Sequence, residues 1–483
     1  MVAIGPVLFI IGLLMSLLAV AMGLPAVADL ATGNPDWQVF AGSAAVSLFV
    51  GVGLMLTTRT GMHTNLNLRQ AFLLTTMSWV AVAAVGALPF AFSELDLSVS
   101  DAFFESMSGI TTTGSTVIVG LDFAPPGILL WRALLQWLGG IGIIVMALAI
   151  LPMLSVGGMQ LFQTEAGDTP DKVLPRAAQL AGGIFAIYLL LTAICALALW
   201  LVGLSGFDAI THSMTTIATG GYSTKDASIG HFRNQAAEWI IVAGMIIGSL
   251  PFVYYLRAVR GDLRPIASDS QVRWFLAVVV LSVASITAWI WLAMEFRPPD
   301  ALRYGAFNVI SVLTGTGYAT SDFAVWGGFP VMLMLCLMFV GGCAGSTTCG
   351  IKIFRFQVLY ATARAQLQRL LLPHGVFVPH FNKAPIPETV SEAVMGFFFL
   401  YIICFGLLAA GLAVLGLDFT TAISGAATAI SNVGPGLGEV IGPSGSFKDL
   451  PESAKWLLSA GMLLGRLELF TVLVMFSPAF WTR

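Results

Sequence analysis

The sequence predicts an all-α integral membrane protein. We expect ten transmembrane helices plus four re-entrant pore helices, arranged as four helix–pore-loop–helix repeats in a pseudo-fourfold arrangement. Three observations predict this fold. Hydrophobic residues fill 57% of the 483 positions and charged residues only 10%, against about 25% charged in soluble domains. The apolar residues fall in runs of about 20, the length that crosses a bilayer. Shorter apolar stretches recur between those runs and share one residue pattern.

Ten apolar runs are long enough to cross a membrane. The first begins without a basic leading region, because residues 1–5 contain no Lys or Arg, so we expect a membrane helix there rather than a signal peptide. The ten runs lie at about 4–23, 38–57, 70–92, 128–154, 180–204, 237–257, 274–296, 330–358, 391–416 and 455–477.

Four shorter stretches, at about 101–111, 208–218, 304–314 and 421–431, lie between these runs. Each is too short to span and too apolar for an ordinary loop, which is typical of a re-entrant segment. A glycine follows each stretch, and a hydroxyl residue stands six positions before that glycine in all four copies. The glycines are Gly114, Gly221, Gly317 and Gly434, and the hydroxyl residues are Ser108, Thr215, Ser311 and Thr428.

The repeated pattern divides the chain into an N-terminal helix pair and four units. Each unit consists of a helix, a short half-helix, a glycine strand and a second helix. The fourth copy departs most from the pattern, because it reads Asn432-Val433-Gly434-Pro435. The expected boundaries are 1–57 for the helix pair and 68–156, 177–260, 271–360 and 388–483 for the four pore repeats, with an intramembrane gating loop at 341–350 in the third.

The distribution of basic residues predicts the orientation. If the first helix starts in the cytoplasm, the cytoplasmic loops hold thirteen Lys and Arg and the tail adds Arg483, against six on the opposite side. This excess predicts that both termini are cytoplasmic and that the four glycine stretches enter from outside. The external loops at 24–37 and 93–127 carry Asp and Glu but no Lys or Arg, so we expect a negative vestibule that concentrates cations.

The glycines indicate what the re-entrant stretches do. Backbone at membrane depth that is neither helix nor closed barrel must be buried in protein or line water. Glycine adopts positive φ freely, so successive carbonyls can turn toward one axis. Four such strands would form rings of carbonyl oxygens that replace the hydration shell of a monovalent cation. The half-helices would aim their partially negative ends at the same axis. One Thr-Gly pair alone would indicate only a turn, whereas four aligned copies favour a filter.

The four motifs resemble the degenerate filters of the Trk/Ktr/HKT superfamily of potassium transporters, and the N-terminal helix pair and the length resemble its bacterial TrkH branch. The resemblance covers essentially the whole chain. It implies that backbone carbonyls of the motif residues bind potassium, which is the substrate. These residues are Thr112, Thr113 and Gly114 in the first copy, Thr219, Gly220 and Gly221 in the second, Gly315, Thr316 and Gly317 in the third, and Asn432, Val433 and Gly434 in the fourth.

The resemblance has further implications. A serine at the first filter glycine accompanies sodium transport in some plant members, so Gly114 implies potassium. The family implies a multi-pass protein of the cell (inner) membrane that contacts lipid, a homodimer, and a cytoplasmic nucleotide-binding TrkA-type regulatory ring. The chain itself has no nucleotide motif, so we expect no cofactor and no enzymatic activity. A net charge of −3 gives no sign of a nucleic-acid partner.

The third unit contains a glycine-rich segment at 341–350. Its composition suits either an unwound loop in a cavity or close helix packing through small residues, and the residues alone favour neither. The resemblance implies an intramembrane loop that obstructs the pore below the filter. The residues expected to form this gate are Gly341, Gly342, Gly345, Ser346, Thr347, Thr348 and Gly350.

Arg466 lies near the middle of the last apolar run. A charge at mid-bilayer costs at least ~2.5–3.5 kcal/mol, so its side chain should face the protein interior or water. Glu468 is two residues on and lies on another side of the helix. One interpretation is a salt bridge to another helix. The other, which the resemblance implies, is that Arg466 projects into the pore as an electrostatic barrier and belongs to the gate.

Two rival functions remain open at this point. The potassium-translocating subunit of a P-type ATPase complex shares the plan of four filters but has a longer chain. A membrane-embedded enzyme would need clustered acids, histidines or metal ligands at the membrane face. The polar segment 373–388 contains His374 and His380 but has no ligand spacing, so we interpret it as a linker or docking surface. A transporter with inverted repeats is disfavoured because the four units run in one direction.

Overall fold

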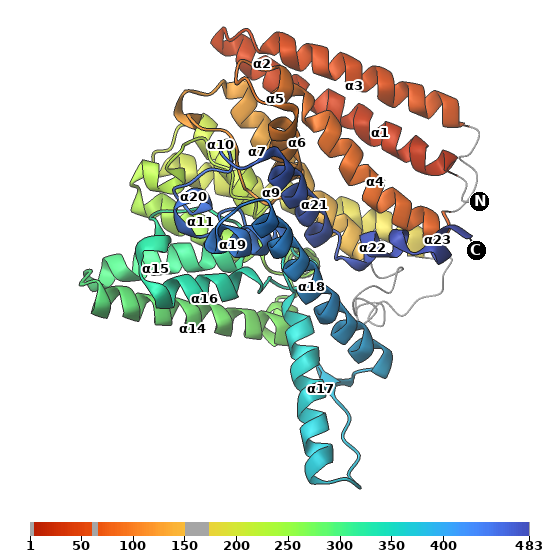
Figure 1. The fold of residues 1–483 in the computed structure, drawn as a ribbon, viewed down its shortest axis with the longest axis vertical. Helices are drawn as coiled ribbons and strands as arrows, with labels where there is room; N and C mark the ends of the chain where they lie inside the picture. Colours follow the sequence, from red (N-terminus) through yellow and green to blue (C-terminus); the bar gives the residue numbers. More distant parts are fainter. Residues whose placement is uncertain (1–3, 60–65, 150–172, 483) are drawn as a thin grey trace.

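The computed structural model describes residues 4–59, 66–149 and 173–482. Helices form nearly all of its regular structure, as the sequence predicts, and they surround a central region where the four glycine stretches lie (Figure 1). The exception is a small antiparallel hairpin of β1 (His380–Phe381) and β2 (Ala384–Pro385). The end of the first predicted repeat, residues 150–156, lies outside the described residues.

The N-terminal helix pair is longer than predicted. Helix α1 (Gly5–Ala21) continues into α2 (Gly23–Thr32), so the predicted external loop at 24–37 is mostly helical, and α3 (Trp37–Thr58) returns alongside (Figure 1). Helices α1 and α3 cross at Gly12 and Gly51. A Cβ atom on Gly12 would lie 2.6 Å from the carbonyl oxygen of Gly51, and one on Gly51 would lie 2.7 Å from that of Gly12. Glycine therefore allows the two backbones to touch.

The residues of the first and second predicted units form several helices each. The first holds α4 (Leu68–Gly86), α5 (Leu88–Phe92), α6 (Val99–Ile110), η2 (Leu121–Phe123) and α7 (Pro126–Ala149). The second holds α9 (Val173–Leu201), α10 (Gly206–Ile217), η5 (Ser228–Phe232), α11 (Gln235–Gly248) and α12 (Phe252–Val259).

The residues of the third and fourth predicted units also form several helices each. Helix α13 (Arg264–Ser268) precedes the third unit, which holds α14 (Ser270–Ala293), α15 (Pro298–Leu313), η6 (Phe323–Val325), α16 (Gly328–Met338) and the start of α17 (Ile353–Leu371). The fourth holds α18 (Glu388–Val414), α19 (Phe419–Ser431), α20 (Gly438–Ile441), α21 (Glu452–Arg466), α22 (Phe470–Leu473), η7 (Val474–Phe476) and α23 (Pro478–Thr482).

A short helix occupies each of the four predicted half-helix stretches: α6, α10, α15 and α19. Three of them begin at a residue whose side chain accepts a hydrogen bond from the backbone N–H three positions on, namely Ser98, Ser205 and Asp418. Such caps satisfy donors that the helix leaves free at its first turn. The fourth, α15, begins instead with Pro298 and Pro299, and proline suits the first turn because its missing N–H is not needed there.

Three of the predicted spans are not continuous helices. Among the described residues, seven helices are long and apolar enough to cross a membrane, or nine if each of two bent pairs is one span. The run at 237–257 bends by 97° between α11 and α12, where Pro251 interrupts the helix. The run at 455–477 bends by 108° after α21, where Glu468 and Leu469 have positive φ. The run at 330–358 ends as a helix at Met338 and resumes at Ile353.

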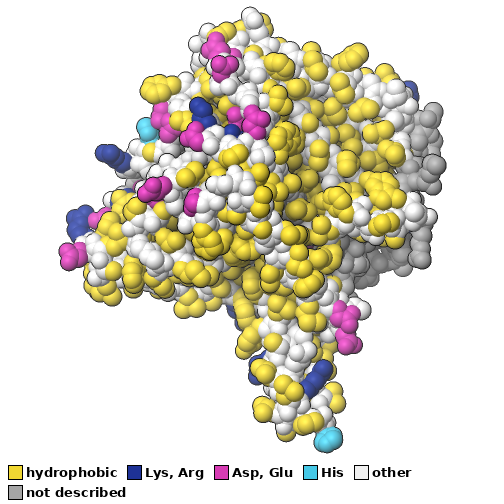
Figure 2. Space-filling view, in the orientation of Figure 1, with side chains coloured by type: hydrophobic (Ala, Val, Ile, Leu, Met, Phe, Trp, Pro, Cys, Tyr) yellow, Lys and Arg dark blue, Asp and Glu magenta, His cyan; other side chains and the backbone are white. Residues whose placement is uncertain are grey.

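The surface is mostly apolar. Figure 2 shows hydrophobic side chains over most of one face, with charged side chains gathered at one edge and near the end of the arm that α17 forms. Large side chains on the spanning helices are widely exposed, including Phe49 at 82% and Leu292 at 72%. An apolar belt of this kind is stable where hydrocarbon surrounds it.

The crossing of α1 and α3 yields a stability prediction. Leucine at Gly12 would overlap the backbone of Gly51, and overpacking of this kind costs about 1–3 kcal/mol. We expect Gly12→Leu to lower the midpoint of thermal unfolding in detergent. Gly53→Leu on α3 is the matched control, because a Cβ there has nothing within 4 Å. Equal melting temperatures for the two variants would contradict the close packing of α1 against α3.

Candidate functional site: four glycine turns and the loop beside them

All four short helices end in the same main-chain turn. The N–H of the residue before each of the four motif glycines donates to the carbonyl five residues earlier, over 2.8 to 3.1 Å. The residue two positions before each glycine has positive φ. This is the Schellman type of C-terminal cap. The donor and acceptor pairs are Thr113 and Ser108, Gly220 and Thr215, Thr316 and Ser311, and Val433 and Thr428. The left-handed residues are Thr112, Thr219, Gly315 and Asn432.

Left-handed backbone at two threonines is unusual. A β-branched residue with positive φ is a steric outlier, and such strain costs about 1–3 kcal/mol and clusters at functional sites. Thr112 and Thr219 have φ of 53° and 50°. The glycines two positions later, Gly114 and Gly221, also have positive φ, at 89° and 79°. The sequence predicted left-handed backbone at the glycines but not at the threonines.

The four glycine turns meet in a closed ring. A Cβ atom on Gly114 would lie 2.3 Å from the carbonyl oxygen of Gly220, and one on Gly221 would lie 1.8 Å from that of Thr316. A Cβ atom on Gly317 would lie 2.1 Å from the carbonyl oxygen of Val433, and one on Gly434 would lie 2.9 Å from that of Thr113. Each turn thus packs against the next in chain order, and the fourth packs against the first. Segments more than 300 residues apart in the sequence, at Thr113 and Gly434, therefore lie side by side.

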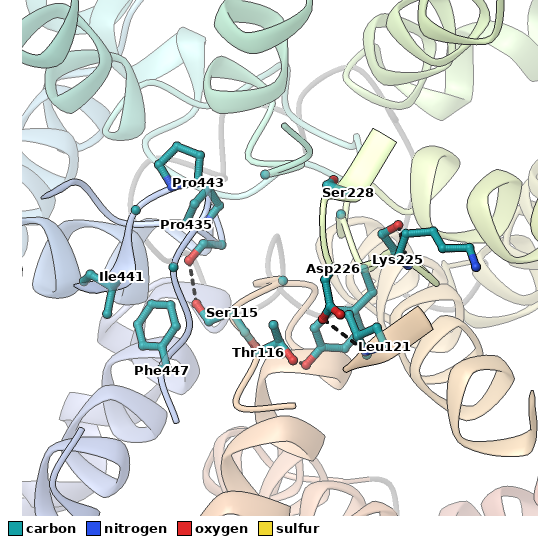
Figure 3. Close-up of a pocket in the computed structure, with 18 of the residues that line it drawn as sticks. Ser115, Thr116, Leu121, Lys225, Asp226, Ser228, Pro435, Ile441, Pro443 and Phe447 are labelled. Carbon is teal, nitrogen blue, oxygen red and sulfur yellow. Dashed lines mark hydrogen bonds between the residues drawn. The ribbon is translucent and has the colours of Figure 1, made fainter. Parts of the chain in front are cut away.

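The residue after each glycine fastens the ring by contacting the preceding copy. Tyr222 Oη donates to the carbonyl of Glu105 over 2.8 Å, and Tyr318 Oη hydrogen-bonds Thr215 Oγ1. Ser115 Oγ donates to the carbonyl of Gly434 over 2.7 Å (Figure 3). In the fourth copy the ring of Pro435 packs where a Cβ on Gly317 would lie. These four residues occupy one repeat position, but the sequence pattern gave no sign of their contacts.

Two of the hydroxyls six positions before the glycines brace their own turns. Thr428 Oγ1 accepts the N–H of Gly434 over 2.8 Å, and Ser311 Oγ donates to the carbonyl of Tyr318 over 2.7 Å. The structure also adds two amide side chains. Gln136 on α7 donates to the carbonyl of Gly220 and accepts the N–H of Tyr222, and Asn432 Nδ2 donates to Thr113 Oγ1. Asn432 stands in the fourth predicted motif, whereas Gln136 lies within a spanning helix, where no sequence pattern indicated it.

The ring opens into a small hollow of about 70 Å³. Gly114, Gly221, Gly317 and Gly434 all line it, and segments from four separate parts of the chain surround it in Figure 3. Asp226 lies at its rim and accepts the N–H groups of Gly120 and Leu121, both over 3.0 Å. The described residues that line the hollow include one carboxylate, Asp226, and two cationic side chains, Arg132 and Lys225.

The predicted negative vestibule is wrong at three of its acidic residues, whereas Glu94 and Asp96 are exposed. Glu105 is fully buried and pairs with Arg132 over 2.8 Å, and Asp101 pairs with Lys455 over 2.5 Å. Asp29, on α2 rather than in a loop, is buried and accepts the N–H of Gly127. Arg132 lies in the same unit as Glu105, Lys455 comes from the fourth unit, and Asp29 binds a backbone N–H. The distribution of charge along the chain does not reveal these contacts.

The glycine-rich segment 341–350 is an unwound loop, so the first of its two interpretations is right. It connects α16 to α17, and its ends pair where the N–H of Gly341 donates to the carbonyl of Ile351 over 2.9 Å. A Cβ on Gly341 would lie 2.0 Å from the carbonyl oxygen of Cys349. The loop also binds the break between α11 and α12, where Phe252 N–H donates to Gly345 and Cys343 N–H donates to Ser249. Ser346 and Thr348 hydrogen-bond each other through their hydroxyls over 2.8 Å.

The loop lies against the left-handed residues of the ring. Thr219 Oγ1 donates to Thr347 Oγ1 over 3.1 Å, and Thr347 Oγ1 in turn lies 2.9 Å from the carbonyl of Gly248. Cys349 Sγ lies 3.9 Å from Thr112 Oγ1. A Cβ on Gly315 would lie 3.9 Å from the backbone nitrogen of Cys349. Three of the four turns therefore touch this loop.

Arg466 ends α21 rather than lying mid-helix, because the chain bends after it. Its side chain is 2% exposed and binds main-chain carbonyls: Nη1 donates to Thr347 and Nη2 to Gly139, over 3.2 and 2.9 Å. Its guanidinium also hydrogen-bonds Cys349 Sγ. No carboxylate pairs with Arg466 among the described residues, so the salt-bridge interpretation fails there. Glu468 pairs instead with Arg355.

Lys352 adds a further buried cation beside the loop. It is 7% exposed, and its Nζ donates to the carbonyl and hydroxyl of Thr348. Arg466 also donates to this loop, at Thr347. Two positive side chains from outside the loop therefore donate to its carbonyls. Carbonyl dipoles stabilise such charges in a medium of low polarity.

Spanning helices around a closed ring of backbone carbonyls define a membrane transport protein rather than an enzyme. The chain belongs to the TrkH family of cation transport proteins, whose model matches residues 36–483. The sequence-based recognition of this family is confirmed, and so is the expectation that the protein is a transporter.

Similar proteins match over nearly the full length. The chain is 45% identical to the Trk system potassium uptake protein TrkI of Halomonas elongata, over 99% of this chain and 97% of that one. It is 40% identical to the Trk system potassium uptake protein TrkH of Escherichia coli K12, over 98% of each. The crystal structure of the potassium transporter TrkH from Vibrio parahaemolyticus superposes with a TM-score of 0.92 at 38% identity, covering 99% of this chain and 100% of that one.

The buried pair of Glu105 and Arg132 yields a second prediction. Removing one partner leaves an uncompensated buried charge, which costs about 3–5 kcal/mol. We expect Glu105→Ala to lower the free energy of unfolding in detergent by this amount, and the double variant Glu105→Ala/Arg132→Ala to lose less than the sum of the single variants. Arg297→Ala is the control, since its pair with Asp300 is exposed and worth about 0–1 kcal/mol. Additive losses would contradict direct coupling.

Proposed function

We propose that this protein takes up potassium across the cytoplasmic membrane through one pore whose filter is the ring of four glycine turns. The closed cycle of contacts from Gly114 to Gly220, Gly221 to Thr316, Gly317 to Val433 and Gly434 to Thr113 carries this proposal. Twelve residues form the filter in this account: 112–114, 219–221, 315–317 and 432–434. Their main-chain carbonyls replace the hydration shell of the ion. The full-length similarity to potassium uptake proteins supports potassium as the ion.

The electrostatics of the ring support a cation of low charge. The four short helices point their C-terminal ends at the ring, and the C-terminus of a helix carries about half a negative charge. Dipoles fixed by hydrogen bonds attract a cation without binding it so tightly that it cannot leave. The side chains of Gln136 and Asn432 hold the turns in place from behind.

The membrane topology of this proposal has ten spans and four pore helices. Nine spans are obtained when the bent pairs α11–α12 and α21–α22 each count as one. The interrupted segment of α16, the loop and α17 adds the remaining span. The helix pair 1–57 and pore repeats 68–156, 177–260, 271–360 and 388–483 are its units. Phe72 near the start of α4 packs against Phe480 in α23, which supports a common side for that end of the chain and the cytoplasmic loop before α4. Both termini are then cytoplasmic.

The loop at 341–350 is the gate in this account, and Arg466 holds it closed. The loop touches three of the four turns, and Arg466 ties Thr347 to Gly139 on α7. A buried positive charge at this position repels a cation that leaves the filter. Opening requires the loop to release Thr347 from Thr219 and Gly248.

The regulation of the gate comes from outside this chain. We propose a homodimer in the cell (inner) membrane with a cytoplasmic nucleotide-binding TrkA-type ring, as the family resemblance implies. The arm of α17 and the β1–β2 hairpin extends away from the helix bundle (Figure 1), and α17 begins directly after the gating loop. A partner that moves this arm would therefore pull on the loop. No cofactor is part of the proposal.

Selectivity tests the filter. Serine at Gly114 must adopt a φ of +89° and would overlap the carbonyl of Gly220, so the ring would distort. We expect Gly114→Ser to lower the potassium-to-sodium flux ratio in proteoliposomes by roughly tenfold, which is about 1.4 kcal/mol. Gly120→Ser is the matched control, because Gly120 has a φ of +83° but open space around it. A ratio unchanged in Gly114→Ser would refute the filter.

Flux through Arg466 variants tests the gate. Arg466→Ala removes a buried charge and the hydrogen bonds to Thr347 and Cys349 of the loop, so we expect potassium flux without any regulatory partner to rise by roughly tenfold or more. Arg466→Lys keeps the positive charge and should raise flux less. Both are compared after gel filtration shows a folded protein. Equal flux in the alanine variant and the unmutated protein would contradict the barrier.

A further inference from the structure

An apolar slot lies between the N-terminal helices and the first unit. Helices α1, α4 and α7 form its walls, and its volume is about 570 Å³. None of the described residues that line it is charged, and Thr75 and Ser78 supply its hydroxyl groups. Two wall residues, Leu17 and Gly142, are exposed at the surface of the protein. The slot therefore opens on the apolar belt of the molecule.

The length of the slot matches one leaflet of a bilayer. Its lining on α1 runs from Ile10 to Ala21, which spans about 16 Å at the helical rise of 1.5 Å per residue. The hydrocarbon core of a membrane is about 30 Å thick, so one leaflet is about 15 Å deep. The lining residues on α4 and α7 run from Leu74 to Val82 and from Leu138 to Met146, about 12 Å each.

Hydrocarbon is the medium that surrounds these walls. All three helices belong to segments apolar and long enough to span a membrane. An uncharged slot open to lipid attracts an acyl chain, because water there would lose hydrogen bonds and an empty slot would lose dispersion contacts. A headgroup has no charged partner among the lining residues, so the chain of the lipid, rather than its polar end, provides the fit.

The inner wall of the slot contacts Arg466, the arginine of the proposed gate. Trp79 lines the slot, and its ring centroid lies 5.6 Å from the guanidinium of Arg466. Gly139 also lines it, and its carbonyl accepts a hydrogen bond from Arg466 Nη2 over 2.9 Å. Ile110, the last residue of the first pore helix α6, also lines the slot. One layer of side chains thus separates the slot from Arg466.

We propose that this slot binds one acyl chain of a membrane lipid, and that the bound chain supports Trp79 and Gly139 and thereby sets the position of Arg466. The binding part stands on the slot alone. The regulatory part rests on the proposed gating role of Arg466. Lipids with chains that fill the slot poorly would leave Trp79 free to move and would change flux without touching the filter.

Photolabelling tests the binding part without any measurement of ion flux. The purified protein is reconstituted with a phospholipid that carries a diazirine on one acyl chain, and the labelled peptides are identified by mass spectrometry. We expect adducts on the facing sides of α1, α4 and α7. Gly142→Phe places a ring in the slot, where a Cβ on Gly142 is 3.8 Å from Trp79, and should reduce these adducts by roughly tenfold.

The controls separate slot filling from misfolding. Gly53→Phe puts the same side chain on the lipid face of α3, where a Cβ has nothing within 4 Å, and should leave the adducts unchanged. Ala21→Leu fills the end of the slot more gently and should reduce labelling if Gly142→Phe does not fold. Adducts that persist in both folded slot variants would overturn the proposal. Cross-links between two copies of the chain at the slot, in place of lipid adducts, would also overturn it.

Flux measured in lipids of different acyl-chain length tests the regulatory part. The unmutated protein and Gly53→Phe should show the same dependence of potassium flux on chain length, and Gly142→Phe should lose that dependence. A dependence retained in folded Gly142→Phe would overturn the link between the slot and Arg466. Absent flux in every protein, with slot labelling intact, would count against the proposed potassium pathway and not against acyl-chain binding.

Discussion

The structure depends on one constraint: irregular backbone within a membrane protein must have its polar groups satisfied by the protein or by what it binds. Here the four glycine turns satisfy each other. The Schellman caps at Thr113, Gly220, Thr316 and Val433 use the helix-end carbonyls, and side chains after each glycine fasten one copy to the previous copy. In the proposed filter the remaining carbonyls face a shared centre, which is what a dehydrated cation requires.

The same constraint explains the buried charges beside the ring. Arg466 and Lys352 bind backbone carbonyls of the loop, and Arg355 pairs with Glu468. The two ends of the loop approach closely at Gly341 and Gly350, where a side chain would not fit. This close approach leaves carbonyls of the loop available to the cations. Charge and unwound backbone thus stabilise each other, and moving either one disturbs both. This coupling is a physical basis for a gate.

The sequence predicted the helices and glycine turns because their signals are local and repeated. Apolar length marked the spans, and alignment of four copies identified Gly114, Gly221, Gly317 and Gly434. It did not predict the bends at Pro251 and Glu468, since apolar runs continue through them. It also missed the partners of Glu105 and Asp101 and the role of Gln136, because these contacts join separate elements and only the folded chain brings them together.

The most direct measurement of the central claim is a crystal structure of the protein soaked in rubidium or thallium, which replace potassium and scatter strongly. The account predicts ordered ion density on the axis of the ring, within coordination distance of the carbonyl oxygens of Thr113, Gly220, Thr316 and Val433. Density confined to acidic side chains such as Asp226, with none inside the ring of a protein that transports these ions, would contradict it.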